Sequence, residues 1–256
     1  MASRYIQNKK ISLPVTIEGE GRQIIFFNGG GATQISWKMV IKNLKGDYQL
    51  VTFDLRGHGK ASVSDDYSFD GFLSDTEAVV SAVSTGKTIL VGWSLGADLA
   101  LAYAIAHPDK VAGVVLIDGA VPLDKPLVED ETLLRQSLKS PIMKLSRWLI
   151  RFTPYNYSIW GDAYANIVLE LDKRRQNLLG DYKNLKCPVT MVLAEESAGS
   201  TGERAMRNNK IWHDGAARLV KQNPSISVEW LQGSHQLPFK HSTELAEVID
   251  TFASNL

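Results

Sequence analysis

The stretch Val91-Gly92-Trp93-Ser94-Leu95-Gly96-Ala97 contains the pattern Gly-x-Ser-x-Gly and separates two segments of different character. The residues before it, from Thr88, are apolar and typical of a buried strand, whereas the run from Ala97 to Ala106 is typical of a helix. A strand that turns so tightly into a helix leaves room only for small residues on either side of the serine. Such a turn lifts the Ser94 hydroxyl out of the sheet, at a helix N-terminus that favours developing negative charge. The stretch therefore predicts a nucleophilic serine, and the alternative is a serine in an ordinary strand-to-helix turn.

Outward from this turn, short apolar runs alternate with helical patterns along most of the chain. We expect strands at 23–27, 48–53, 88–91, 111–117, 189–193 and 226–231, and helices at 36–44, 69–84, 94–107, 202–221 and 243–252. Residues 5–18 contain Lys9, Lys10 and Pro14 and are expected to form an edge hairpin, which charge and proline protect from aggregation. Repeated alternation predicts an α/β fold, in which a mostly parallel sheet is covered by helices on both faces. Ligands of such sheets bind beyond the carboxyl ends of the strands, where Ser94 is expected to lie.

Residues 121–186 break this alternation. The segment is rich in charged and aromatic residues, contains no strand-like run, and has apolar positions at helical spacing, such as Leu145, Leu149 and Phe152. We therefore expect a helical cap, packed over the end of the sheet and inserted into a core that comprises 1–120 and 187–256. The aromatic residues of the cap either line a pocket or pack among its helices; they include Trp148, Phe152, Tyr155, Tyr157, Trp160 and Tyr164.

The composition narrows the classes of function. Over 256 residues, 28 Lys and Arg balance 28 Asp and Glu, and neither sign forms a long block. Nothing therefore indicates a nucleic-acid groove or a basic face that binds a membrane. The single cysteine, Cys187, excludes an intrachain disulfide and is expected to pack rather than to react. No apolar stretch approaches membrane-spanning length and the N-terminus lacks the apolar core of a signal peptide, so we expect a soluble, cytoplasmic protein.

Two cofactor motifs begin in this sequence but are incomplete. Gly86-Lys87-Thr88 resembles the end of a phosphate-binding loop, but Ser81 stands where that loop has glycine, and the tripeptide precedes a strand. The glycine run at 29–31 does not complete a dinucleotide-binding pattern, because Gln34 stands at the last glycine position. No pair of histidines or cysteines has the spacing of a metal site. We therefore expect neither a cofactor nor a metal.

Four motifs in sequence give the chain a resemblance to the α/β-hydrolase superfamily. They are Phe27-Asn28-Gly29-Gly30, Asp54-Leu55-Arg56-Gly57-His58-Gly59, Gly92-Trp93-Ser94-Leu95-Gly96 and Gly233-Ser234-His235. Each motif alone is weak, but the four occur in the order of the family, and the resemblance covers nearly the full chain, with 121–186 as the variable cap. It implies that Ser94 attacks a carbonyl with His235 as its general base. It also implies that the backbone amides of Gly30 and Leu95 form the oxyanion hole.

The acid that orients His235 is left with two candidates. Most members of the family place an aspartate after the next-to-last strand, where this chain has Ser197, which cannot carry the charge. Asp118 follows the preceding strand, a position that some members use. Glu196 lies beside the usual position, and Glu195 is a weaker alternative there. We favour Asp118 and keep Glu196 as the alternative.

The resemblance implies a hydrolase of small carboxylic esters that needs no cofactor, with a small ester-like molecule as its partner. A second hypothesis keeps the same groups and changes the bond to a lactone, a thioester or a carbon–carbon bond. A third is a ligand-binding protein of this fold with little turnover. The remaining histidines are expected to be structural: His58, His107, His213 and His241.

Overall fold

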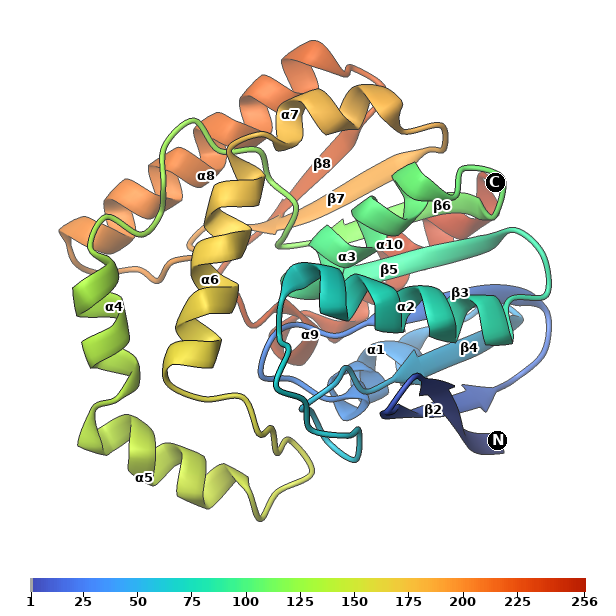
Figure 1. The fold of residues 1–256 in the computed structure, drawn as a ribbon. Coiled ribbons are helices and arrows are strands. Elements are labelled where there is room, and N and C mark those ends of the chain that lie inside the picture. Colours follow the sequence, from blue (N-terminus) through green and yellow to red (C-terminus); the bar gives the residue numbers. More distant parts are fainter. Residues whose placement is uncertain (1) are drawn as a thin grey trace.

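A mixed sheet lies at the centre of the molecule in the computed structural model, which describes residues 2–256 (Figure 1). Its eight strands follow the order β1-β2-β4-β3-β5-β6-β7-β8. They are β1 (Ala2–Asn8), β2 (Ile11–Glu18), β3 (Arg22–Phe27), β4 (Tyr48–Phe53), β5 (Thr88–Trp93), β6 (Val111–Ile117), β7 (Val189–Ala194) and β8 (Ser227–Leu231). β1 and β2 form an antiparallel hairpin at one edge, and the strands from β4 to β8 pair in parallel. The predicted α/β fold is confirmed.

Helices cover both faces of this sheet (Figure 1). One face is covered by α2 (Phe69–Val83), α3 (Leu95–Ala106) and α8 (Glu203–Gln222), and the other by η1 (Gln34–Trp37), α1 (Lys38–Asn43), α9 (Leu237–Lys240) and α10 (Ser242–Ser254). Neighbouring strand residues such as Leu90 and Val91 belong to different core clusters. Successive side chains of a strand point to opposite faces, so the buried central strands β3, β5, β6 and β7 each supply both clusters.

Between β6 and β7 the chain is helical, as its spacing predicts. The segment contains α4 (Glu131–Leu138), α5 (Pro141–Ile150), α6 (Asp162–Arg175), α7 (Leu178–Asp181) and η2 (Tyr182–Asn184). In Figure 1, α6 lies beside the core, whereas α4 and α5 form an arm on its outer side. Arg135 of α4 donates to Asn166 of α6 at 2.8 Å and so helps hold this arm.

The helices of this segment differ in how they pack. α6 contributes Ile167 and Leu171 to the core, whereas α5 has no buried residue. Leu145, Leu149 and Phe152 remain 59%, 54% and 70% exposed. They share one helical face, as their spacing predicts, and this face points to solvent, because spacing alone does not fix the direction of a helical face. Among residues 2–256, no helix combines the length and hydrophobicity needed to cross a membrane.

Candidate active site

Ser94 lies at the turn between β5 and α3 in a strained backbone conformation, with φ 56° and ψ −122°. The turn requires glycine on both sides of the serine. A Cβ added at Gly92 would overlap the carbonyl oxygen of Gly96, and one added at Gly96 would overlap the carbonyl oxygen of Phe27. The Gly-x-Ser-x-Gly pattern thus follows from the close approach of three backbone segments, which presents the Ser94 hydroxyl at the edge of the sheet.

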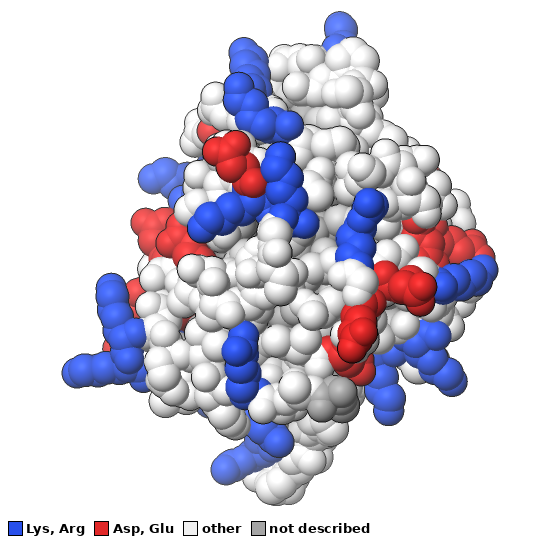
Figure 2. Space-filling view, turned by 90° about the vertical axis from the view of Figure 1, so that its right-hand side faces the viewer, with Lys and Arg blue, Asp and Glu red and all other residues white. Residues whose placement is uncertain are grey.

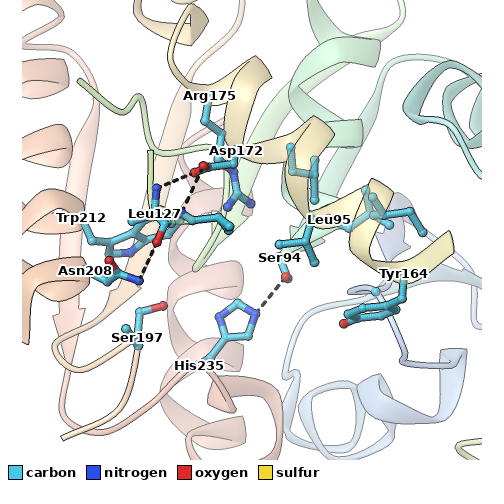
Figure 3. Close-up of a pocket in the computed structure, with 16 residues that line it drawn as sticks. Ser94, Leu95, Leu127, Tyr164, Asp172, Arg175, Ser197, Asn208, Trp212 and His235 are labelled. Carbon is cyan, nitrogen blue, oxygen red and sulfur yellow. Dashed lines mark hydrogen bonds between the residues drawn. The ribbon is translucent and has the colours of Figure 1, made fainter. Parts of the chain in front are cut away.

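His235 faces Ser94 from the loop that follows β8 (Figure 3). Its Nε2 lies 2.8 Å from Ser94 Oγ. Trp93, the residue before the serine, holds this loop in place: its Nε1–H donates to the His235 carbonyl at 2.9 Å, and the two ring centroids are 5.4 Å apart. The turn that carries the serine is thereby tied directly to the loop that carries the histidine.

Asp118 is fully buried after β6 and binds the other side of the His235 ring, with Oδ2 2.6 Å from Nδ1. The same oxygen accepts the Ser197 hydroxyl at 2.7 Å, and Oδ1 accepts the Ala194 N–H and the Trp212 Nε1–H, both at 3.1 Å. Burial alone would raise the pKa of Asp118, but His235 and the other donors outweigh it and hold the pKa below its usual value. An ionised Asp118 keeps a proton on Nδ1, which leaves Nε2 to accept the serine proton.

The other acid candidates lie elsewhere. Glu196 is exposed, and within residues 2–256 its carboxylate forms neither a hydrogen bond nor an ion pair; its backbone N–H donates to the Gly233 carbonyl at 3.0 Å. The carboxylate of Glu195 lies 3.5 Å from His213. The structure therefore brings Asp118, and not Glu196, to His235.

Gly30 and Leu95 both line the cavity beside Ser94. In the described chain, neither backbone N–H donates to another protein group. Gly31, the next residue, is held by His58, whose Nε2 accepts its N–H at 2.8 Å while Nδ1 donates to the Arg56 carbonyl at 2.9 Å. Burial lowers the pKa of His58 to about 4, so the ring is neutral, as these two bonds require. His58 thus holds the glycine run in place at Gly31, next to the Gly30 N–H, which has no acceptor within the described chain.

A cavity of about 300 Å³ opens beside Ser94, a size that suits a small ligand. Figure 3 places Tyr164 at one end of it, and Trp212 and Asn208 at the other. Its walls come from the sheet edge, the loop before α4, α6, the loop after β7, and α8: Gly30, Ser94, Leu95, Leu127, Val128, Tyr164, Ile167, Val168, Leu171, Asp172, Arg175, Ser197, Ala198, Asn208, Trp212 and His235.

The polar groups of this cavity are largely engaged within the protein. Asp172 accepts the backbone N–H groups of Leu127 and Val128 at 2.8 and 3.3 Å. Arg175 forms a two-bond ion pair with buried Asp98, at 3.0 and 2.6 Å. These contacts hold α6 and the loop before α4 against the core, so they define the walls of the cavity.

The other histidines have separate contacts. His107 lies 3.4 Å from Glu77, His213 stacks on Trp230 with centroids 4.0 Å apart, and His241 lies 3.0 Å from Glu244. Of the five histidines, only His235 forms a hydrogen bond with Ser94 in the described chain.

Neither the thiol of Cys187 nor a cluster of metal-ligating side chains offers a second reactive site within residues 2–256. Cys187 is half-buried against the core, and burial raises the pKa of its thiol to about 11. The thiol therefore stays protonated at neutral pH, as a packing role requires. Among residues 2–256, no group of three or more His, Cys, Asp and Glu is arranged to hold a metal ion.

Sequence reasoning missed several residues that support the site. Trp212 and Arg175 come from helices whose sequences carry no catalytic motif, and the contact between Arg175 and Asp98 spans 77 positions of the chain. Only Ser197 had a usable signal, because a hydroxyl at the usual place of the acid suggests a hydrogen bond to a carboxylate that comes from elsewhere.

Known proteins share this fold. A profile described as the alpha/beta hydrolase fold matches residues 23–218. The chain is 31% identical over 97 residues to the pimeloyl-[acyl-carrier protein] methyl ester esterase of Wigglesworthia glossinidia brevipalpis, covering 38% of this chain and 36% of that protein. It is 30% identical over 132 residues to the 2-(acetamidomethylene)succinate hydrolase of Mesorhizobium japonicum, covering 51% and 46%. The matches thus span less than half the length of these relatives. A solved structure from work on carboxylesterases of the thaumarchaeon Nitrososphaera gargenis is similar over 98% of both chains, with a TM-score of 0.78 and 15% identity.

Proposed function

Because the chain belongs to the α/β-hydrolase fold family, we propose that it hydrolyses small carboxylic esters through an acyl intermediate on Ser94. The observation that carries the proposal is the unbroken line of hydrogen bonds from Ser94 Oγ to His235 Nε2 and from His235 Nδ1 to Asp118 Oδ2, at 2.8 and 2.6 Å. Nucleophile, base and acid in this order are the groups that acyl transfer requires.

In the first half of the reaction, Ser94 Oγ attacks the ester carbonyl carbon while His235 Nε2 accepts the hydroxyl proton. The negative charge that develops on the carbonyl oxygen is stabilised by the N–H groups of Gly30 and Leu95. Asp118 stabilises the imidazolium ion through the Nδ1–H bond. The imidazolium then gives its proton to the departing alkoxide, and the acyl group stays on Ser94.

In the second half, a water molecule takes the place of the alcohol. His235 accepts a proton from the water, whose oxygen attacks the acyl carbon, and the same two N–H groups again stabilise the oxyanion. When the tetrahedral intermediate breaks down, His235 returns the proton to Ser94 Oγ. The products are one carboxylic acid and one alcohol, and the enzyme is restored.

The cavity supports a small substrate. Its volume of about 300 Å³ lies at the lower end of the range for small-molecule sites. Segment 121–186 acts as the cap, since Tyr164, Ile167 and Leu171 of α6 form one wall of the cavity. The names of the two relatives, a methyl ester esterase and a hydrolase, agree with a hydrolytic reaction.

The proposal is tested with p-nitrophenyl acetate and butyrate, together with a fluorophosphonate probe, on the wild-type protein and Ser94→Ala. We expect turnover of both esters and labelling of Ser94 in the wild type, and Ser94→Ala should lose the label and at least about 10⁴-fold in kcat. Labelling of Ser94 without ester turnover would overturn the ester proposal in favour of another bond or of a binding role. Unchanged esterase activity in Ser94→Ala would refute the nucleophile.

A further inference from the structure

Helix α5 lies at the outer edge of the molecule (Figure 1), and large apolar side chains on one side of it are exposed to solvent. We define the outer face of α5 by Ile142, Leu145, Trp148, Leu149 and Phe152, which are 79%, 59%, 54%, 54% and 70% exposed. Spacings of three and four residues place these side chains along one side of the helix and of the turn that ends it. The half-buried residues Met143, Arg147 and Ile150 lie on the other side, which contacts the rest of the protein.

Uncompensated positive charge accompanies this face. Residues 139–161 contain four cations and no Asp or Glu. Lys139 is paired with Asp162 at 2.7 Å, but within residues 2–256 the other three cations, Lys144, Arg147 and Arg151, form no ion pair. These three cations also line a groove of about 690 Å³ between α5 and residues 156–160.

The face of the molecule that looks away from α5 carries both signs of charge (Figure 2). On the face shown in Figure 2, which looks at the side away from α5, Lys and Arg are interspersed with Asp and Glu. The net charge of the whole chain is zero, so it conceals a segment in which all four charges are positive. This is why the composition predicted no basic face that binds a membrane.

We propose that α5 docks on the surface of an anionic lipid bilayer. The exposed aromatic and aliphatic side chains of the outer face would enter the headgroup region, while the exposed cations Lys144 and Arg151, which flank that face, meet the lipid phosphates. Large apolar residues on one face of a helix, flanked by Lys and Arg without acids, are the pattern of helices that lie in a membrane interface. A bilayer surface supplies both requirements in one plane, an apolar layer and negative charge.

A second copy of the chain fits this surface less well. Pairing two outer faces would bury the apolar side chains but would bring Lys144 and Arg151 of both copies, four uncompensated cations, to one interface, and like charges across an interface are unfavourable. The docking proposal is also independent of ester hydrolysis, since neither Ser94 nor His235 takes part in it.

The test measures binding of the full-length protein to vesicles of phosphatidylcholine alone and of equal parts phosphatidylcholine and phosphatidylglycerol. Co-sedimentation gives the partition coefficient, and the emission of exposed Trp148 reports entry into the headgroup region. We expect binding to the anionic vesicles with a blue shift of emission, at least tenfold weaker binding to phosphatidylcholine alone, and weakening by salt.

Variants separate the contribution of the cations to vesicle binding from that of the apolar side chains. Lys144→Gln with Arg151→Gln should weaken binding about 25-fold, at about fivefold for each cation removed. Leu149→Glu with Phe152→Glu should reduce it below detection. Val63→Glu is the matched control, because Val63 is a 65% exposed apolar residue outside α5, and it should bind as the wild type does. Unchanged circular dichroism and p-nitrophenyl ester turnover would show that each variant is folded.

Three results would overturn the proposal. The first is that the wild type does not bind anionic vesicles, or that it binds them no better than the double variant Leu149→Glu/Phe152→Glu. The second is a wild-type dimer in analytical ultracentrifugation that Leu149→Glu dissociates, which would make a second copy the occupant. The third is retention on immobilised polyglutamate but not on vesicles, which would make the occupant an acidic protein.

Discussion

The carboxyl edge of the sheet and helix α5 illustrate two ways of building a functional surface. At the sheet edge, Ser94 and Asp118 adopt φ values of 56° and 42°, and each reacting group has a defined hydrogen-bond partner. On α5 no residue is buried and the apolar side chains end in solvent. The proposed chemistry requires atoms placed within fractions of an ångström, whereas docking on a surface requires only apolar and cationic character on one side of a helix. The sheet edge should therefore respond to subtle changes, and α5 only to changes of polarity or charge.

The largest expected effect on the free energy of unfolding concerns His58, which is buried at the sheet edge. The folded protein keeps this ring neutral down to about pH 4, while the unfolded chain binds a proton below its ordinary pKa of 6.5. The unfolded state therefore binds more protons between these values, and the free energy of unfolding should fall as the pH is lowered through them. The free energy of unfolding should fall by about 1.4 kcal/mol per pH unit, or by about 3 kcal/mol over the whole window. Above pH 6.5 the ring is neutral in both states, so His58 adds no pH dependence there.

Urea unfolding of the wild type and His58→Gln across this pH window checks the prediction. His58→Gln should lose this part of the slope, although it is less stable at neutral pH. Equal slopes in wild type and His58→Gln would show that His58 is not held neutral by the fold.

A smaller effect is expected from Ser197, whose hydroxyl donates to Asp118 Oδ2 at 2.7 Å. Ser197→Ala removes one hydrogen bond to a buried carboxylate, so the pKa of Asp118 should rise and its hold on His235 should weaken. We expect kcat for p-nitrophenyl butyrate to fall about tenfold, which corresponds to one charge-assisted hydrogen bond of roughly 1.5 kcal/mol. Ser197→Thr keeps a hydroxyl and should restore most of the rate. If the alanine variant turns over at the wild-type rate, Ser197 does not support the acid.

The smallest effect is expected from the outer face of α5. Leu149→Glu changes a side chain that is 54% exposed and contributes to no wall of the cavity beside Ser94. Its kcat/KM for p-nitrophenyl acetate should stay within about twofold of the wild type, since surface substitutions rarely exceed about 0.5 kcal/mol. A tenfold loss without a drop in thermal stability would mean that α5 takes part in the site, and the contrast between the two regions would fail.

The two regions also differ in how far their structure follows from the sequence. At the nucleophile turn, steric overlap dictates glycine at positions 92 and 96, so a local pattern predicts a local geometry. The alternation of buried strands and helices likewise predicts the α/β fold, because each strand must be covered on both faces. For α5 the helical spacing predicts which residues share a face, but the direction of that face depends on packing with distant segments.

The surroundings of Asp118 could not be predicted for the same reason. Its carboxylate binds Ser197, Trp212 and His235, which lie 79, 94 and 117 positions away along the chain. The sequence left Asp118 and Glu196 as competing acids because both follow strands that end at the same edge of the sheet. In the folded chain the two differ clearly: the Asp118 carboxylate is buried and has four hydrogen-bond donors, whereas Glu196 is exposed.

The most direct test of the central claim, that the carboxylate after β6 orients the base, compares Asp118→Asn with Glu196→Gln. Both substitutions remove a charge and keep the shape of the side chain. We predict that Asp118→Asn lowers kcat for p-nitrophenyl butyrate about 10⁴-fold, since an amide at this position disfavours the required tautomer of His235. Glu196→Gln should stay within about twofold of the wild type. Near-full turnover in Asp118→Asn, with a loss of orders of magnitude in Glu196→Gln, would contradict the account.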